Sequence, residues 1–384
     1  MIFQGNNLKE KSLALVFTLG VGLKTWNDSG MLYREVALYN KLCNYFKKIF
    51  FFTYDKSVDN KLRNYLDEKI EIILMPGIFF NKNRKIQYIA YIIYSFLMPF
   101  IHRKYFLKSD FIKTNQMRGA WSALIAKMFF RKKLIARAGY IWSKFAIQNN
   151  DNKLVILIIK LIEKIVYKFA NVVISSSKKD KEYVEARNKV TDKSVLIKNY
   201  VDTENFRPMN LQKKAASLCF IGRLEAQKNL FELLKSLMNS EYNLSIVGDG
   251  SLKDDLVEFA REKKIKAEFP GIVSNERLPQ LLNQHEVFIL PSVYEGMPKS
   301  LLEAMACGLP VIGNDVEGIN EVIVNNSNGL LCKEDAASIR KTIDFLIKDS
   351  DLKNNLGKNA RETIIKDFSL DSVLRKEIEV YEQL

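Results

Sequence analysis

Residues 290–323 read LPSVYEGMPKSLLEAMACGLPVIGNDVEGINEVI and begin at the end of an apolar run. This order predicts a buried strand, a loop and then a helix with Pro298 in its first turn. Glu295 would lie in the loop and Glu303 on the helix, because eight residues make about 2.2 helical turns. Gly296 lets the backbone approach a ligand, and free amides at a helix start attract phosphate or sugar oxygens. Two glutamates at this spacing are usually surface residues, but the Gly and Pro between them favour a ligand site.

Thirteen short apolar runs alternate with longer amphipathic segments along the chain. Such alternation is typical of βαβ units, in which helices cover both faces of a parallel sheet. We therefore expect an α/β protein with two doubly wound parallel sheets, one in each half of the chain. The expected strands are 13–18, 49–53, 70–75, 110–113, 133–136, 172–175, 195–197, 217–221, 243–247, 267–269, 287–290, 310–312 and 329–331.

Length and charge distribution indicate two domains. The 384 residues suffice for two domains, since a domain typically has about 100–200 residues. Their hydrophobic fraction of 47% excludes a disordered chain. Residues 1–210 carry a net charge of +20 and residues 211–384 one of −5, which indicates different partners for the two halves. The irregular stretch Asn199–Lys214 lies where the sign changes and is the expected linker.

Cysteines and histidines exclude several kinds of site. The four cysteines lie far apart without a Cys-x-x-Cys pair, so neither a disulfide scaffold nor a cysteine zinc site is expected, and a reducing cytoplasm fits. Two histidines, His102 and His285, are too few for a histidine-based metal site. The apolar run 13–23 resembles a signal peptide, but no small-x-small cleavage site follows it, which favours a strand.

The stretch at residues 290–323 closely resembles the retaining nucleotide-sugar glycosyltransferases of family 4. It carries that family's Glu-x7-Glu motif as Glu295 and Glu303, followed by EAMACGLPVI. Three further passages match in the expected order: Asn199-Tyr200-Val201-Asp202 with Phe206-Arg207-Pro208, Gly222-Arg223-Leu224 with Lys228, and Val247-Gly248-Asp249-Gly250. Tyr200 stands where the family commonly has Gly. Together the matches cover residues 172–366.

This resemblance implies the GT-B fold, in which two Rossmann-like, doubly wound parallel-sheet domains face each other across a cleft. Residues 1–205 would form the domain that binds the acceptor, and residues 206–366 the domain that binds the nucleotide-sugar donor. Residues 367–384 would form a helix that crosses back onto the first domain, as this fold commonly does.

Charge and resemblance together assign the donor site. The leaving nucleoside diphosphate carries about two or three negative charges, which the planar guanidinium of Arg223 and the ammonium of Lys228 would bind. By resemblance, Glu303 would bind the donor ribose, and Glu295 the hydroxyls of the donor sugar. The expected catalytic residues are Glu295, Arg223 and Lys228. The other expected donor-binding positions are Gly222, Gly248, Gly271, Val273, Gly296, Met297, Pro298 and Lys299.

No metal and no cofactor is expected. The other large glycosyltransferase fold uses an Asp-x-Asp doublet after a strand to hold a divalent cation, and no such doublet stands in a strand–loop context here. The nucleotide-sugar itself is a substrate.

The first half of the chain resembles the family more loosely. Ser29-Gly30-Met31 stands in the place of the family's glycine loop, so Gly30 would let the backbone approach the donor phosphate or the acceptor. Arg34 would pair with an anion, although an exposed Arg at a helix start is an equally good interpretation. Arg137, after an expected strand, would bind acceptor or donor phosphate. Many relatives carry a His in this domain, but Thr114–Gly119 occupies its place and His102 is expected at the surface.

Two apolar segments raise the question of membrane contact. Residues 86–101 and 154–169 are strongly apolar with basic residues within or beside them, but each is shorter than the about 20 residues that span a bilayer. They are either core helices of the first domain or peripheral contacts with anionic lipid, and one helix can serve both purposes. Nucleic-acid binding is not expected, because no recognition motif accompanies the positive charge.

The sequence therefore predicts a cytoplasmic glycosyltransferase, peripheral on the inner face of a bacterial cell membrane. It would transfer a sugar from a UDP-sugar, with a GDP-sugar as the alternative, to a hydroxyl of a lipid-linked glycan. Transfer would occur with retention at the anomeric carbon, in surface polysaccharide biosynthesis. Two other interpretations are an epimerase or phosphorylase of similar fold and a non-catalytic relative that acts in assembly. The presence of Glu295, Glu303, Arg223 and Lys228 together argues against the non-catalytic one.

Overall fold

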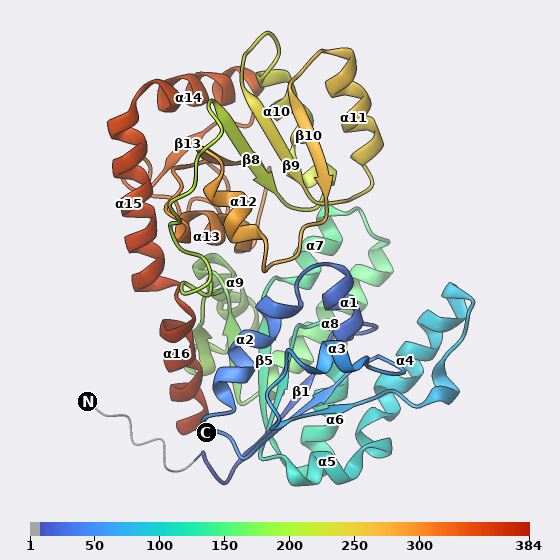
Figure 1. The fold of residues 1–384 in the computed structure, drawn as a ribbon. Helices are drawn as coiled ribbons and strands as arrows, with labels where there is room; N and C mark the ends of the chain where they lie inside the picture. Colours follow the sequence, from blue (N-terminus) through green and yellow to red (C-terminus); the bar gives the residue numbers. More distant parts are fainter. Residues whose placement is uncertain (1–7) are drawn as a thin grey trace. The chain divides into compact units, whose positions relative to one another are not determined.

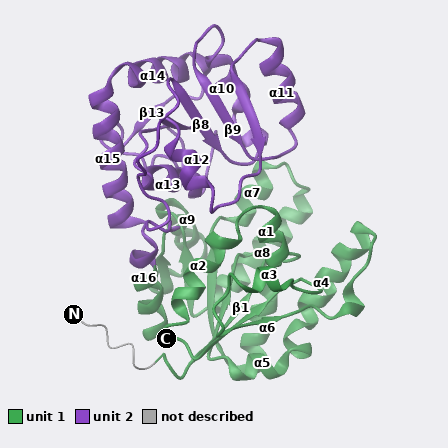
Figure 2. Ribbon diagram, viewed as in Figure 1, with its two compact units in different colours: residues 1–198, 374–384 green, residues 199–373 purple. Residues whose placement is uncertain are grey.

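The computed structural model describes residues 8–384, and residues 1–7, the start of the expected first domain, lie outside this range. The chain divides into two compact units (Figure 2). Unit 1 runs to Lys198 and also contains Leu374–Leu384, and unit 2 comprises Asn199–Val373. The domain boundaries expected at 205/206 and 366/367 lie a few residues from these divisions.

Unit 1 is built on a parallel sheet of seven strands in the order β3-β2-β1-β4-β5-β6-β7 (Figure 1). The strand order reverses between β1 and β4, and in open α/β sheets ligands bind at the carboxyl edge beside such a reversal. The strands are β1 (Ser12–Val16), β2 (Lys48–Phe52), β3 (Ile70–Ile73), β4 (Phe111–Thr114), β5 (Lys133–Ala138), β6 (Val172–Ser175) and β7 (Ser194–Leu196).

Helices cover both faces of this sheet. One face packs against α4, α5, α6 and α8 in a core that includes Phe52, Tyr94 and Val166. The other face packs against α2, where the rings of Tyr39 and Phe51 lie 5.2 Å apart, and against α16 (Leu370–Glu382), whose Tyr381 ring lies 5.4 Å from that of Phe111. The helices of unit 1 are α1 (Leu23–Asp28), α2 (Leu32–Leu42), α3 (Asn60–Arg63), η2 (Gly77–Phe79), α4 (Arg84–Ile101), α5 (Arg103–Lys108), α6 (Ala120–Phe130), α7 (Trp142–Gln148), α8 (Lys153–Phe169), α9 (Lys178–Asn188) and η3 (Thr191–Lys193).

Unit 2 has a parallel sheet of six strands in the order β10-β9-β8-β11-β12-β13, with its reversal between β8 and β11. Its strands other than the edge strand β10 are largely apolar and buried, as expected for a parallel sheet with helices on both faces. The strands are β8 (Ser217–Ile221), β9 (Asn243–Val247), β10 (Ala267–Gly271), β11 (Val287–Leu290), β12 (Val311–Asn314) and β13 (Leu330–Cys332). The helices are η4 (Ala226–Lys228), α10 (Leu230–Ser236), α11 (Lys253–Glu262), α12 (Leu278–Asn283), α13 (Lys299–Ala306), α14 (Ala336–Lys348) and α15 (Ser350–Asp367).

The last helix, α16 (Leu370–Glu382), begins in unit 2 and belongs to unit 1 from Leu374 onward. A buried ion pair holds it there: Lys113 Nζ of β4 lies 2.6 Å from Glu377 Oε1, and both side chains are fully buried. Burial lowers the pKa of Lys113, and the charge of Glu377 opposes that shift. Removing one partner of such a pair leaves a buried charge uncompensated and costs about 3–5 kcal/mol.

Every expected strand is present, and the observed ends differ from the expected ones by at most two residues. The α/β fold class with two parallel sheets is therefore confirmed. Residues 86–101 and 154–169 lie in the helices α4 and α8, each of which buries one side and exposes apolar residues on the other. No helix within residues 8–384 is both long and apolar enough to cross a membrane.

Candidate functional site

Three predicted glycines meet at the carboxyl edge of the sheet of unit 2. The amide of Gly222, after β8, donates to the carbonyl of Val247 at 3.0 Å, and the amide of Gly248, after β9, donates to Gly271 at 2.9 Å. Gly248 has φ +138°, and a Cβ there would lie 1.9 Å from the carbonyl oxygen of Gly222. The three loops are therefore tied backbone to backbone, and only glycine fits at position 248.

Arg223 is exposed and lies in the loop after β8. Hydrogen bonds of a neighbouring residue hold this loop in place. The carboxylate of Glu225 accepts hydrogen bonds from the amide of Ser251 at 3.1 Å and from its hydroxyl at 2.7 Å. These bonds hold the pKa of Glu225 below its ordinary value. Glu225 and Ser251 carry no sequence signal of a site, and their hydrogen bonds shape the loop that presents the Arg223 guanidinium to solvent.

The expected catalytic residues Lys228 and Glu295 contact each other directly. The ammonium of Lys228 forms an ion pair with Glu295 Oε1, and the hydroxyl of Ser292 donates to the same oxygen at 2.7 Å. The side chains of Lys228 and Glu295 are 12% and 9% exposed. A charge-assisted pair in such a sheltered place is stronger than one on the surface. Ser292, three residues before Glu295, was not predicted as a site residue.

The loops that carry Lys228 and Glu295 also share backbone contacts. Gln227 donates from its side chain to the carbonyl of Tyr294 at 2.7 Å, and its own carbonyl accepts from the amide of Val293 at 3.0 Å. On the other side, Gly318 has φ +84°, and a Cβ there would lie 2.3 Å from the carbonyl oxygen of Gly296. Gly318 was not predicted as a site residue, since only the packed structure shows that its backbone supports this loop.

Gly296–Lys299 leads into α13. Pro298, which was expected in the first turn of the helix, is the residue that precedes it, and Lys299 begins the helix. Met297 is buried, and its carbonyl accepts a hydrogen bond of 2.9 Å from the side-chain amide of Asn199. This hydrogen bond from Asn199, at the start of unit 2, fixes the backbone of the loop.

Glu303 lies on α13 and is 1% exposed. Its Oε1 accepts a hydrogen bond of 3.2 Å from the side-chain amide of Asn275, which is also buried. Asn275 follows Gly271 and Val273 in the loop after β10, so its hydrogen bond joins this expected donor-binding loop to the carboxylate expected to bind the ribose. Asn275 carries no sequence signal that sets it apart from a surface Asn.

The three first-half residues lie on separate elements of unit 1. Gly30, with φ +69°, forms the turn between α1 and α2, and Arg34 of α2 lies 3.6 Å from the neighbouring Glu35. Arg137 of β5 is 9% exposed and lies 3.8 Å from the buried Glu377 of α16. Arg137 therefore belongs to the buried charge cluster that holds α16, in addition to the ligand role expected of it.

The loop that directly follows β1 is not the one that the sequence analysis chose. It spans residues 17–22 and contains Gly20 and Gly22, whereas Gly30 comes one helix later. A Cβ at Gly22 would lie 2.3 Å from the carboxyl group of Asp55, so a larger residue there would displace this carboxylate. Two glycines immediately after a predicted strand are the signal that could have identified this loop.

A pocket of about 300 Å³ opens beside this loop in unit 1. The Asp55 carboxylate, 9% exposed, accepts a hydrogen bond of 2.6 Å from the amide of Leu23, and burial raises its pKa. Tyr91 of α4 and Phe80 supply aromatic surface, while Lys24, Lys56 and Asp28 supply charge. Aromatic rings beside carboxylates and hydroxyls are a common lining for a sugar.

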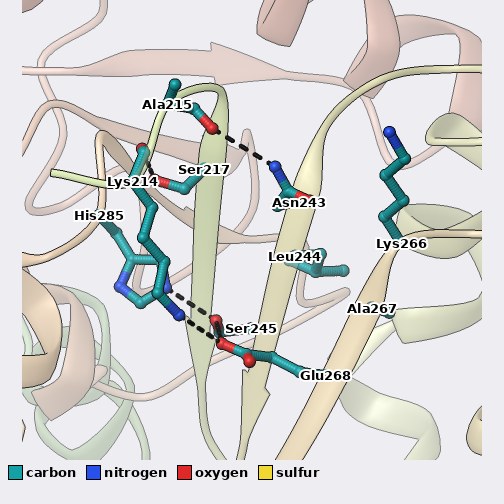
Figure 3. Close-up of a pocket in the computed structure, with 10 residues that line it drawn as sticks. All are labelled: Lys214, Ala215, Ser217, Asn243, Leu244, Ser245, Lys266, Ala267, Glu268 and His285. Carbon is teal, nitrogen blue, oxygen red and sulfur yellow. Dashed lines mark hydrogen bonds and ion pairs between the residues drawn. The ribbon is translucent and has the colours of Figure 1, made fainter.

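Figure 3 shows a second pocket, of about 610 Å³, at the opposite edge of the sheet of unit 2. Ser245 lies 2.7 Å from His285 Nε2 and also donates to Glu268, which pairs with Lys214 at 3.0 Å. His285 Nδ1 bonds to the carbonyl of Leu281 at 2.8 Å rather than to a carboxylate. The order of these groups is therefore not that of a nucleophilic triad, and the pocket lies at the amino ends of β8–β10, away from the donor residues.

His102 is half-buried, so its expected place at the surface was wrong. Its Nε2 lies 2.9 Å from the hydroxyl of Tyr94, and burial lowers its pKa to about 4. It is a structural contact of α4 and β2 rather than a catalytic base. Within residues 8–384, no group of three or more His, Cys, Asp or Glu side chains is arranged to hold a metal ion.

Comparison with known proteins places this geometry in a class. HepE from Anabaena, in complex with UDP and glucose, superposes with a TM-score of 0.76 at 16% identity, over 97% of this chain and 100% of that one. The fold is therefore that of the GT-B glycosyltransferases, as predicted. Residues 201–363 match the family model described as glycosyl transferases group 1.

Two curated relatives are similar over longer stretches. One is the UDP-Gal:α-D-GlcNAc-diphosphoundecaprenol α-1,3-galactosyltransferase of Escherichia coli, 30% identical over 59% of this chain and 64% of its own length. The other is the N,N'-diacetylbacillosaminyl-diphospho-undecaprenol α-1,3-N-acetylgalactosaminyltransferase of Campylobacter jejuni, 26% identical over 83% of this chain and 92% of its own. Both names describe transfer to a lipid-linked sugar.

Proposed function

We propose that this chain is a retaining glycosyltransferase that moves a sugar from a nucleoside diphosphate donor, a UDP-sugar in the first instance, to a hydroxyl of a lipid-linked glycan. The observation that carries the proposal is the cluster of Lys228, Glu295 and Ser292 at the glycine-tied edge of unit 2. It joins a cation for a phosphate to a carboxylate for sugar hydroxyls in one sheltered place, within the residues that match the family.

In the proposed reaction the bond between the anomeric carbon and the diphosphate oxygen breaks, and a bond to the acceptor hydroxyl oxygen forms on the same face. The acceptor proton passes to the leaving phosphate oxygen, so no protein base is needed. Arg223 and Lys228 would stabilise the charge that develops on the diphosphate, where fixed cations are most effective. Glu295 and Glu303 would hold the sugar and ribose hydroxyls, and neither a metal nor a cofactor would take part.

Support for the donor and the acceptor comes from different places. A UDP donor agrees with the name of the Escherichia coli relative and with the UDP bound to HepE. A lipid-linked acceptor agrees with both relatives' names, and the pocket at Gly22 and Asp55 offers it a sugar-like lining. Such an acceptor would place the chain on the cytoplasmic face of a bacterial membrane, in surface polysaccharide biosynthesis.

A donor screen tests this proposal. Purified chain is mixed with UDP, GDP and their sugars in the presence of EDTA, and melting temperature and nucleoside diphosphate release are measured with and without a diphosphoundecaprenol-linked sugar. We expect UDP to raise the melting temperature and release to need the acceptor. Conversion of the donor sugar without an acceptor would indicate an epimerase instead, and no binding to either nucleotide would contradict the proposal.

A further inference from the structure

Unit 1 exposes an apolar stripe along the whole length of α4. Its members are spaced three and four residues apart, so they lie on one side of the helix. They are Ile86, Ile89, Ile93, Phe96, Leu97 and Phe100, each 42–56% exposed. The opposite side of the helix carries the buried Tyr94, Ser95 and Met98. The helix α4 is thus apolar both on its buried side and on its exposed side, whereas a helix that only packs on the core needs an apolar buried side alone.

The helix α8 repeats this arrangement. It buries Ile159, Val166 and Tyr167 and exposes a second stripe. That stripe consists of Leu154, Leu157, Ile158, Leu161 and Ile165, of which Leu157 is 63% exposed. In unit 2, by contrast, the exposed large apolar residues lie on different elements and form no stripe.

The helix α6 lies between the two and contacts both. Phe129 of α6 is 65% exposed, and its ring lies 4.9 Å from that of Phe100 of α4. Trp121 of α6 stacks on Phe96 of α4 at 5.7 Å. The three helices pack in one layer on the same face of the sheet, so the stripes belong to one surface, which we call the α4–α6–α8 face (Figure 1).

The exposed charges of the segments that form this face are positive, although Asp151 lies just before α8. Residues 81–108 and 117–133 contain no Asp or Glu, and the single carboxylate of residues 153–169, Glu163, is 5% exposed and bonded to the amide of Ser143. The exposed cations in these segments are Lys82, Arg84, Lys85, Arg103, Lys104, Lys108, Arg131, Lys133, Lys153, Lys164 and Lys168. An apolar surface rimmed mainly by Lys and Arg complements an anionic surface with an apolar interior.

We propose that the α4–α6–α8 face is the membrane-docking surface of this protein and that its occupant is an anionic lipid bilayer. The apolar stripes would enter the boundary between headgroups and acyl chains, while the cations would contact the headgroups. A second copy fits less well, because a symmetric interface would place lysines against lysines. Docking on the membrane would bring the proposed glycosyltransferase to a lipid-linked acceptor. The biological meaning of this surface therefore rests on the proposed function.

Vesicle flotation of the full chain tests the proposal without any sugar donor, so its failure is separate from failure of the transferase assignment. We expect flotation with vesicles of phosphatidylcholine and phosphatidylglycerol, and little with phosphatidylcholine alone or in high salt. The double variant Leu157→Ser/Leu161→Ser should lower the bound fraction about tenfold, since two partly exposed leucines no longer enter the lipid. The matched control is Phe345→Ser/Ile365→Ser in unit 2, which should bind as the parent does.

A second measurement distinguishes insertion from charge attraction alone. Vesicles with brominated acyl chains should quench the fluorescence of Trp121, and Trp121→Phe should remove that quenching. Two results would overturn the proposal. One is flotation that is equal for the parent and the α8 variant. The other is a dimer, seen by light scattering, that the α8 variant converts to monomer while the parent binds no vesicles.

Discussion

Lys228 and Glu295 form a sheltered ion pair in unit 2, and the hydroxyl of Ser292 donates to the same carboxylate oxygen at 2.7 Å. Before a donor binds, therefore, the cation proposed for the donor diphosphate is already paired with the carboxylate proposed for the donor sugar. A diphosphate that enters this place competes with Glu295 for the ammonium. The two residues should consequently have separable effects on nucleotide binding and on transfer.

Replacing Lys228 should weaken nucleotide binding. In Lys228→Met the ammonium is lost, while the hydroxyl of Ser292 still donates to the Glu295 carboxylate. We expect UDP affinity, measured by calorimetry, to fall about tenfold to a hundredfold, since a hydrogen bond to a charged group contributes about 1.5–3 kcal/mol. Lys235→Met removes a lysine from an exposed pair with Glu232 and should bind UDP as the parent does. Equal affinity of the two variants would refute the role of Lys228.

Replacing Glu295 should separate binding from chemistry. Glu295→Gln keeps the shape of the side chain but releases Lys228, so UDP should bind as tightly as before or more tightly. Transfer should fall by about 10² or more, the usual effect of removing a group that acts on the transition state. Steady-state rates and calorimetry on the same preparation measure both. A variant that loses UDP binding and transfer in equal proportion would show that Glu295 acts only through the fold.

Gly248→Ala should destabilise the chain. Its φ of +138° and the 1.9 Å approach of a Cβ to the carbonyl of Gly222 leave no place for a methyl group. We expect a loss of about 2–4 kcal/mol in the free energy of unfolding, from backbone strain and overpacking together. Gly77→Ala is the matched control, because nothing lies within 4 Å of a Cβ there. Equal melting temperatures for the two variants would contradict the close packing of these loops.

His102 should make unit 1 sensitive to acid. Burial lowers its pKa to about 4 in the folded chain, against 6.5 for an ordinary His, so unfolding takes up a proton between these values. The free energy of unfolding should therefore fall as the pH is lowered from about 6.5 to 4. In His102→Gln, whose side-chain oxygen can still accept from Tyr94, the fall should be smaller.

The three tryptophans, Trp26, Trp121 and Trp142, all lie in unit 1, so their fluorescence during urea unfolding reports the unit that holds His102. His285, whose pKa is also lowered by burial, lies in unit 2 and should affect this signal little. Parallel pH profiles for the parent and His102→Gln would refute the assignment.

The strands of both sheets could be predicted from the sequence because buried parallel strands are short apolar runs between polar turns. The unit 2 glycines, Lys228 and Glu295 could also be chosen, since they belong to motifs with fixed spacing. The same reasoning missed Ser292, Asn275 and Gly318. A short polar residue or a glycine next to a motif has no pattern of its own, and its role depends on which loop packs against it.

The residues of the first half of the chain were harder to predict from the sequence. Ser29-Gly30 is the predicted glycine loop, but Gly20 and Gly22 lie in the loop that directly follows β1, and the short helix α1 separates the two positions. Asp55 lies more than thirty residues from α1 in sequence, yet its carboxylate accepts a hydrogen bond from the amide of Leu23 at the start of that helix. Such a partner can be found only once β1 and β2 are known to be neighbours.

The most direct test of the central claim is the anomeric configuration of the product. The assay would contain the protein, EDTA, a UDP-sugar whose sugar is α-linked to the diphosphate, and a diphosphoundecaprenol-linked acceptor. NMR of the product would give the configuration of the new linkage. We predict an α-linked product, formed by the parent and at least about a hundredfold more slowly by Glu295→Gln. A β-linked product, or transfer that requires a divalent metal, would contradict the account.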